Sequence, residues 1–131
     1  MNGGWLTGKY RDAAPVAADS RLQRRYGRLA EFELRRPPNR AKLARLAALH
    51  DAARAAGVSL PQLALRWVIG RRGIVAALVG SRTREQLVEL PSGLDDGLSE
   101  RTRSTVNAIC PPEATIDPAD TGRHHGRRLS I

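Results

Sequence analysis

Cysteine, lysine and aromatic residues are scarce in this sequence, and it has no long apolar run. Cys110 is the only cysteine, which excludes an internal disulfide and a multi-cysteine zinc site and fits a reducing cytoplasm. Aromatic residues make up 4% of the chain, so platforms for stacking nucleic-acid bases are not expected. No apolar stretch approaches the ~20 residues of a membrane span, and no signal-peptide pattern opens the chain. These absences favour a cytoplasmic protein.

The chain has the length of one domain and a strongly basic balance. It holds 131 residues with a formal net charge of +9, which would suit a nucleic-acid-binding protein. Nearly all basic residues are arginines, because Lys9 and Lys42 are the only lysines. The arginines are spread along the chain, which is typical of solvated helix faces and not of a binding stripe. Nucleic-acid binding is therefore retained only as an alternative.

The stretch that carries the strongest signal is residues 74–86, IVAALVGSRTREQ. Residues 74–79 are uninterruptedly apolar and partly β-branched, the pattern of a short strand buried on both faces. Gly80 ends this run, and Thr83 with Gln86 three residues later predicts a capping box and a helix. A strand, a glycine turn and a helix start present free N–H groups to an anion. Ser81 and Arg82 stand in that turn, so the sequence predicts a phosphate site there.

Upstream of this stretch, two helices are predicted over residues 39–71. In the first, leucine and alanine recur at helical spacing, and Gly57 supplies the stop. Ser59 and Gln62 form a capping box at the start of the second, which is apolar over much of its circumference. His50 in the first helix fits a packed histidine better than a metal ligand.

Downstream, two further helices and a tail are predicted. The helix after Thr83 is limited to about two turns by Pro91, with Leu87 facing inward. Ser99 caps a last helix that ends near residue 109. Residues 111–131 are polar and charged without periodicity, so we expect a disordered tail in which His124 and His125 are solvated.

Several blocks of this chain resemble the aldo-keto reductase family. Residues 4–10, GWLTGKY, resemble the segment that follows the seventh barrel strand of that family, and residues 19–21 resemble a Ser-Arg of its large loop. Residues 59–68, SLPQLALRWV, are similar to the helix before the eighth strand. Residues 74–86 are similar to that strand and its cofactor motif. Residues 98–100 resemble the start of the family's C-terminal helix.

The resemblance implies an α/β fold, the C-terminal fragment of a (β/α)8 TIM barrel, mostly helical with one parallel-type strand at about 74–80. It divides residues 1–110 into a cofactor-covering loop (1–38), helices (39–71), the last strand, and the cofactor and C-terminal helices (83–109). It implies NADP(H) as cofactor and carbonyl reduction or alcohol oxidation as the reaction. Ser81 and Arg82 would bind the 2′-phosphate. The other cofactor-binding residues implied are Gly80, Gln86, Glu89, Gly4, Lys9 and Arg21.

Two departures from the family pattern limit this reading. Leu90 stands where many members have an asparagine, which weakens the expected adenine contact. The family's catalytic Asp, Tyr, Lys and His come from the first half of the barrel, so the resemblance assigns no catalytic residue to this chain. We therefore expect a fragment of a longer chain, a truncated reading frame or a gene remnant that is inactive alone.

The expected partners of the chain are a small carbonyl substrate in the complete enzyme, and the missing barrel half or a second copy. A non-catalytic nucleotide-binding protein is the alternative.

Overall fold

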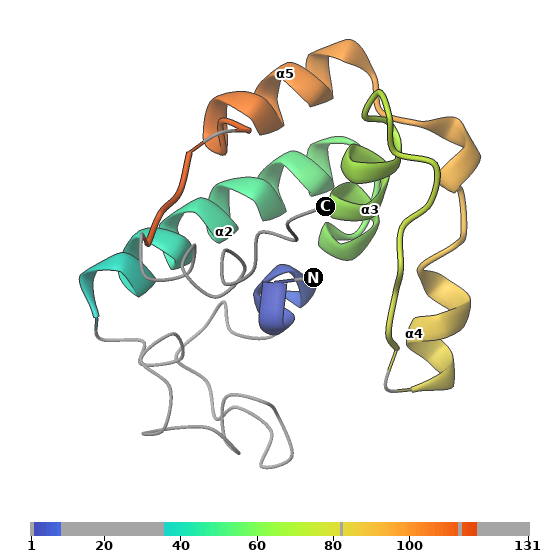
Figure 1. Cartoon of the computed structure of the whole chain (residues 1–131), viewed down its shortest axis with the longest axis horizontal. Helices are drawn as coiled ribbons and strands as arrows, with labels where there is room; N and C mark the ends of the chain where they lie inside the picture. Colours follow the sequence, from blue (N-terminus) through green and yellow to red (C-terminus); the bar gives the residue numbers. More distant parts are fainter. Residues whose placement is uncertain (1, 9–35, 82, 113, 118–131) are drawn as a thin grey trace, which may run out of the picture.

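The computed structural model describes residues 2–8, 36–81, 83–112 and 114–117, and this part of the chain is mostly helical (Figure 1). The described elements are η1 (Asn2–Thr7), α2 (Pro37–Ala55), α3 (Leu60–Ile69), α4 (Arg84–Glu89), η3 (Leu94–Asp96) and α5 (Glu100–Ile109). Helix α2 packs against both α5 and α3, and α3 also contacts η1 and η3. None of the described helices is both long and apolar enough to cross a membrane.

Helix α2 begins at Pro37, two residues before the predicted start, and ends before Gly57 as predicted. Pro37 and Pro38 occupy its first turn, where the N–H groups have no helical partner in any case. At its end, the N–H of Val58 donates to the carbonyl of Ala53 at 3.0 Å and that of Gly57 to Arg54 at 3.1 Å. This pair of bonds is a Schellman motif, which needs a left-handed residue, and Gly57 supplies it with φ of 69°.

Helix α3 begins with the predicted capping box. The hydroxyl of Ser59 accepts from the N–H of Gln62 at 3.4 Å, and the Gln62 carboxamide oxygen accepts from the Ser59 N–H at 3.0 Å. Each residue thereby pairs an N–H group that would otherwise lack a helical partner. The box places the chain so that Leu60 and Leu63 turn into the core.

Ser59→Ala is expected to lower the free energy of unfolding by about 1 kcal/mol, because the N–H of Gln62 loses its acceptor. Urea denaturation followed by circular dichroism measures this loss. Ser104→Ala is the matched control, since Ser104 lies exposed in the middle of α5 and alanine favours helix there. Equal losses in the two variants would contradict a role of the box in stability.

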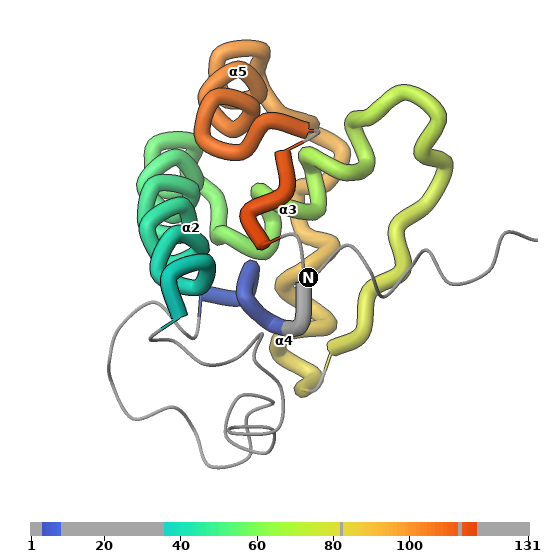
Figure 2. The backbone as a smooth tube through the Cα atoms, turned by 60° about the vertical axis from the view of Figure 1, so that its left-hand side comes forward, coloured from blue at the N-terminus to red at the C-terminus, as the bar shows by residue number. Residues whose placement is uncertain are grey.

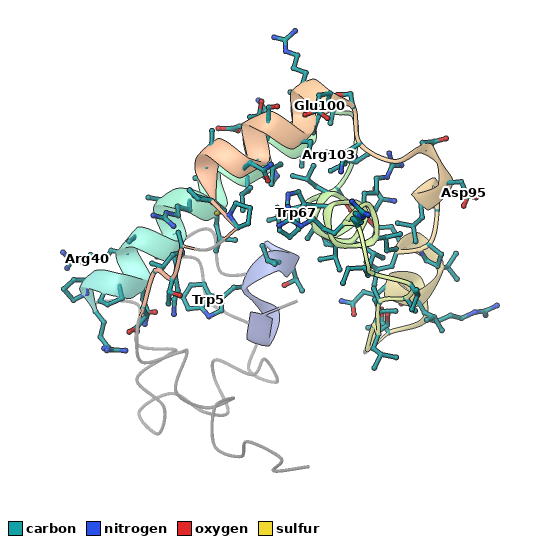
Figure 3. The ribbon with its side chains drawn as sticks, turned by 45° about the horizontal axis from the view of Figure 1, so that its top comes forward. Trp5, Arg40, Trp67, Asp95, Glu100 and Arg103 are labelled. Atoms are coloured by element: carbon teal, nitrogen blue, oxygen red, sulfur yellow. The ribbon has the colours of Figure 1, made fainter. Side chains whose placement is uncertain are left out.

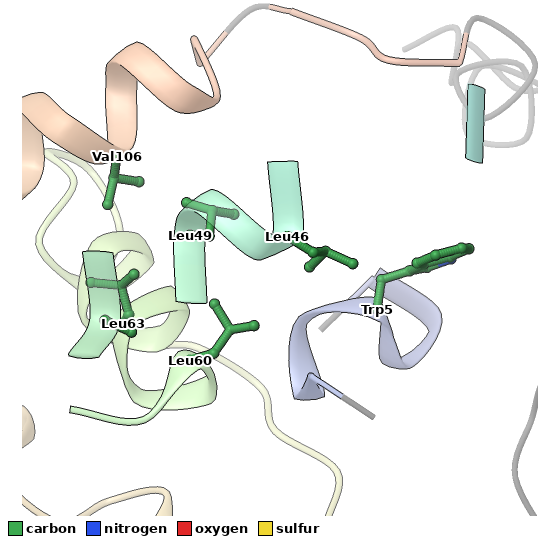
Figure 4. Close-up of a cluster of buried hydrophobic side chains, with 7 residues drawn as sticks. Trp5, Leu46, Leu49, Leu60, Leu63 and Val106 are labelled. Carbon is green, nitrogen blue, oxygen red and sulfur yellow. The ribbon is translucent and has the colours of Figure 1, made fainter. Parts of the chain in front are cut away.

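The core lies where η1, α2, α3 and α5 meet (Figure 4). Among its members, Leu63 is only 1% exposed and Trp5 4% exposed. The apolar faces predicted for residues 39–71 are thus confirmed in part, since Val68 and Ile69 at the end of α3 are exposed. The buried cluster is formed by Trp5, Leu46, Leu49, Ala53, Leu60, Leu63 and Val106.

Residues 74–80 do not form the predicted strand, and the described residues contain no strand at all. The segment leaves α3 and bows away from α2 and α5 as coil (Figure 2). Val75 and Leu78 are fully exposed, at 101% and 104%. A strand needs a neighbour to pair its N–H and C=O groups, and the described part of the chain offers none. The strand prediction is therefore not confirmed.

Helices α4 and α5 begin directly after their predicted cap residues, Thr83 and Ser99. The Thr83 hydroxyl accepts from the N–H of Gln86 at 3.3 Å, and the Ser99 hydroxyl accepts from that of Thr102 at 3.1 Å. Helix α5 ends at Ile109 as expected. The prediction that Leu87 faces inward is wrong, because α4 buries no residue and Leu87 is 55% exposed.

Candidate functional site

The predicted phosphate turn lies between the coil of residues 74–80 and helix α4. Of its residues, Arg82 lies outside the described part of the chain. The Ser81 hydroxyl oxygen is buried yet makes no hydrogen bond to any described residue. An unmatched buried hydroxyl is costly, so this oxygen is suited to meet a ligand atom. A Cβ added at Gly80 would meet nothing within 4 Å, so the turn is open on that side.

Gln86 and Glu89 lie one turn apart on α4, as their spacing predicts. Both residues are exposed. The N–H of Gln86 is used by the Thr83 cap, whereas the main-chain carbonyl of Glu89 accepts from the Gln62 carboxamide at 3.1 Å. Both side chains stand on the surface of the helix that follows Ser81.

The remaining predicted residues come from the N-terminal segment. Gly4 lies in η1 with φ of 103°, and its carbonyl accepts from the Thr7 hydroxyl at 2.7 Å. Lys9 and Arg21 lie outside the described residues. η1 packs against α3, and no comparable contact joins it to α4. The described structure therefore brings Gly80, Ser81, Gln86 and Glu89 together by chain continuity, but it does not bring Gly4 to them.

The position of α4 is set by Gln62, a role that its capping motif did not reveal. The Gln62 carboxamide nitrogen donates to the Glu89 carbonyl, and it lies 2.9 Å from the Ser92 hydroxyl and 3.3 Å from the Ser92 carbonyl. The Ser92 hydroxyl itself donates to the Glu89 carbonyl at 2.8 Å. One amide thus joins the start of α3 to the end of α4.

Arginines hold the other connections around α3, and these too were not predicted. Arg66 donates to the carbonyl of Gly97 at 3.3 Å and pairs with Asp96 at 3.7 Å. Arg103 of α5 donates to the carbonyl of Gly70 at 3.0 Å, at the end of α3. Arg66 thus joins α3 to the η3 segment, and Arg103 joins α5 to the end of α3, where Figure 3 labels it together with Trp67.

Trp67 lies between α3 and α5 and contacts polar groups through both its N–H and its ring. Its indole N–H donates to the Asn107 amide oxygen at 2.9 Å. The Arg71 guanidinium lies over its ring, 4.3 Å from the centroid, a favourable cation–π geometry. Arg71 also follows the C-terminal end of α3, where a cation suits the negative end of the helix dipole. Arg66, Arg71 and Arg103 therefore each hold a contact within the fold.

An apolar cavity of about 500 Å³ lies between α2, α3, α5 and residues 77–79. Leu49, Leu63 and Trp67 are among its lining residues. Its described titratable lining groups are Lys42, Arg45 and Cys110. Burial raises the pKa of the Cys110 thiol, while the nearby Arg45 guanidinium lowers it by a smaller amount. The described lining includes no carboxylate, tyrosine or histidine.

The described residues form no cluster of metal-binding side chains. Among the residues that the structure describes, no group of three or more His, Cys, Asp and Glu side chains is placed to hold an ion. His50 lies half-buried on α2, the packed position its pattern favours. His124 and His125 lie outside the described residues.

Comparison with known protein families gives a match over most of the chain. The model of the Aldo/keto reductase family matches residues 1–108. The match covers η1, helices α2, α3 and α4, the turn that holds Ser81, and α5 except for its last residue, Ile109. It spans most of the chain, in agreement with the blocks of resemblance read from the sequence.

Proposed function

Because the chain belongs to the Aldo/keto reductase family, we propose that it is the C-terminal, NADP(H)-binding part of an oxidoreductase of that family. The complete enzyme moves a hydride between the nicotinamide and a carbonyl carbon. This chain supplies nucleotide binding and not the proton transfer, which requires a tuned acid. The family membership also implies that the chain derives from a TIM barrel.

The observation that carries the proposal is the Ser81 hydroxyl. It is buried and has no hydrogen-bond partner among the described residues, and it adjoins Arg82 in the sequence. In the proposed complex this hydroxyl and the Arg82 guanidinium hold the 2′-phosphate, because both groups donate hydrogen bonds and the guanidinium is always charged. The residues present therefore fit a phosphate at this turn.

The other proposed contacts surround the adenosine and the pyrophosphate. Gln86 and Glu89 present polar side chains on the surface of α4, where the adenosine lies in the proposed complex. Gly80 leaves the turn open for close approach of the ligand. Gly4, Lys9 and Arg21 belong to the segment that covers the pyrophosphate, although the described contacts do not join Gly4 to the turn.

Arg82→Ala is expected to weaken NADPH binding by about 1.5–3 kcal/mol and to leave NADH binding nearly unchanged, because only NADPH carries the 2′-phosphate. Calorimetric titration of the purified chain with both cofactors measures the difference. Arg84→Ala is the matched control, since it removes the same charge from an exposed position two residues away. Equal weakening of both cofactors would contradict the assignment of Arg82.

A non-catalytic nucleotide-binding protein is the second candidate. It is favoured by the lining of the apolar cavity, whose described titratable groups are two cations and one thiol. The two candidates differ in one measurement. A chain that binds NADPH but shows no carbonyl reduction, even when mixed with the N-terminal part of a family member up to the end of its seventh strand, is a binding protein only.

A further inference from the structure

Helix α4 is held in place at its C-terminal end by hydrogen bonds. The helix has 6 residues, buries none of them and lies apart from α2 and α5 (Figure 1). Pro91 cannot continue the helix, so the carbonyl of Glu89 lacks a helical donor. It accepts instead from the N–H of Ser92 at 3.2 Å, from the Ser92 hydroxyl at 2.8 Å and from the Gln62 carboxamide at 3.1 Å. Of these donors, only Gln62 belongs to another element.

Gln62 is suited to this contact because the capping box fixes its side chain. Its carboxamide oxygen accepts from the Ser59 N–H at 3.0 Å, which orients the amide so that its nitrogen reaches α4. The same nitrogen lies 2.9 Å from the Ser92 hydroxyl. A side chain already held at one atom loses little further rotamer freedom when it makes these bonds. One amide group thus caps the start of α3 and the end of α4.

Arg66 supplies a second anchor on the same face of α3. It follows Gln62 by four residues, so the two side chains are neighbours on the helix surface. Arg66 donates to the Gly97 carbonyl at 3.3 Å and pairs with Asp96 at 3.7 Å. Residues 96–97 therefore stay on α3 when the Gln62 bonds are removed, and the effect of that removal is confined to α4 and the turn before it.

We propose that Gln62 is a positioning residue of the nucleotide site, which holds α4 in the orientation that binds the adenosine. The inference rests on the proposed NADP(H)-binding function, and it assigns to that site a residue that does not touch the cofactor. Glu89 connects the two, because its main-chain carbonyl is bonded to Gln62 and its exposed side chain is one of the proposed adenosine contacts. When α4 leaves this orientation, Glu89 no longer meets a cofactor held at Ser81.

A positioning role has a quantitative signature in the affinities of the two cofactors. The apparent dissociation constant of every ligand of a site rises by the inverse of the fraction of molecules in which the site is formed. NADPH and NADH share the adenosine, so release of α4 weakens both by the same factor. Loss of the Arg82 guanidinium is instead expected to affect NADPH alone. The ratio of the two affinities therefore separates a positioning residue from one that contacts the 2′-phosphate.

Gln62→Glu tests this role, because glutamate keeps the acceptor for the Ser59 N–H but has no N–H to donate to α4. In calorimetric titration it is expected to weaken NADPH and NADH equally, by about five- to tenfold, as for the loss of one or two hydrogen bonds. Gln62→Met introduces no charge and is expected to do the same. Ser59→Ala keeps the backbone N–H that orients Gln62, so it should change both affinities by less than about twofold.

Amide hydrogen exchange of the same variants reports on α4 directly. The Leu90 amide donates to the Gln86 carbonyl at 3.1 Å, and its exchange is expected to be about five- to tenfold faster in Gln62→Glu, in line with the loss of these bonds. Saturation with NADPH is expected to slow it again. The Cys110 amide, which donates to the Val106 carbonyl of α5 at 2.8 Å, should exchange at an unchanged rate. A general loss of stability would instead accelerate both amides.

Several results would overturn the positioning role. They are unchanged cofactor affinities or unchanged Leu90 exchange in Gln62→Glu, and faster exchange at Cys110 as well as at Leu90. A loss for NADPH alone, or a loss in Gln62→Glu but not in Gln62→Met, would also overturn it, since either result points to repulsion between the new charge and the phosphates. Failure of the proposed function is distinguishable, because the unmodified chain would then bind neither cofactor, and the inference would fail with it.

Discussion

Replacing Trp5 with alanine is expected to lower the free energy of unfolding by about 3–5 kcal/mol. Trp5 is the large aromatic residue that fixes η1 to the helices, and it is only 4% exposed. It belongs to the same buried cluster as Leu46 and Leu60, and the Lys42 ammonium lies 5.6 Å from its ring centroid. Alanine would leave a cavity and remove the cation–π contact together. Urea denaturation followed by far-ultraviolet circular dichroism measures the loss.

The control for this prediction is Trp5→Phe. Phenylalanine keeps a ring in the core and a π face for Lys42, so the loss is expected to be clearly smaller than for alanine. A Trp5→Ala variant as stable as the unmodified chain would mean that η1 is not docked on α3 in solution.

Leu63→Ala is the other substitution with a large expected effect, a loss of about 2–5 kcal/mol. Leu63 is 1% exposed and faces the centre of the cluster from α3. Its removal enlarges the apolar cavity that it lines, so the transfer and cavity costs add. Because small domains are only marginally stable, the variant is expected to be largely unfolded at room temperature.

Leu87→Ala is the control, which shows whether the loss expected for Leu63→Ala comes from burial or from the removal of any leucine. It deletes the same side chain from an exposed position, where Leu87 is 55% exposed, and should change the free energy of unfolding by less than about 0.5 kcal/mol. Similar losses from the two leucines would contradict the buried cluster as the main source of stability. The same denaturation measurement serves both variants.

The helices of this chain could be predicted because their signals are local. Ser59, Thr83 and Ser99 cap helices by bonds that reach only three residues ahead, and Gly57 ends α2 by its own backbone conformation. Such features depend on neighbours in the sequence and persist whatever lies elsewhere. The inward face of α4 could not be predicted in this way, because burial depends on what packs against Leu87.

The strand and the site depend on partners that local patterns do not supply. Residues 74–80 have the composition of a buried strand, yet pairing needs a second strand that the described residues lack. Ser81 was assigned to the phosphate turn from its place after Gly80, and that assignment stays a prediction. Nothing in the spacing, however, revealed the second role of Gln62, because its contact with Glu89 crosses 27 residues.

That contact has a consequence for the order in which the chain becomes structured. Helix α4 has 6 residues and buries none of them, and a helix so short does not persist in water on its own. Its end is tied to Gln62, whose side chain is oriented by the start of α3. The turn at Ser81 is therefore expected to open more readily than the core. Amide hydrogens of α4 should exchange with solvent whenever α3 opens, and their protection cannot exceed that of the core.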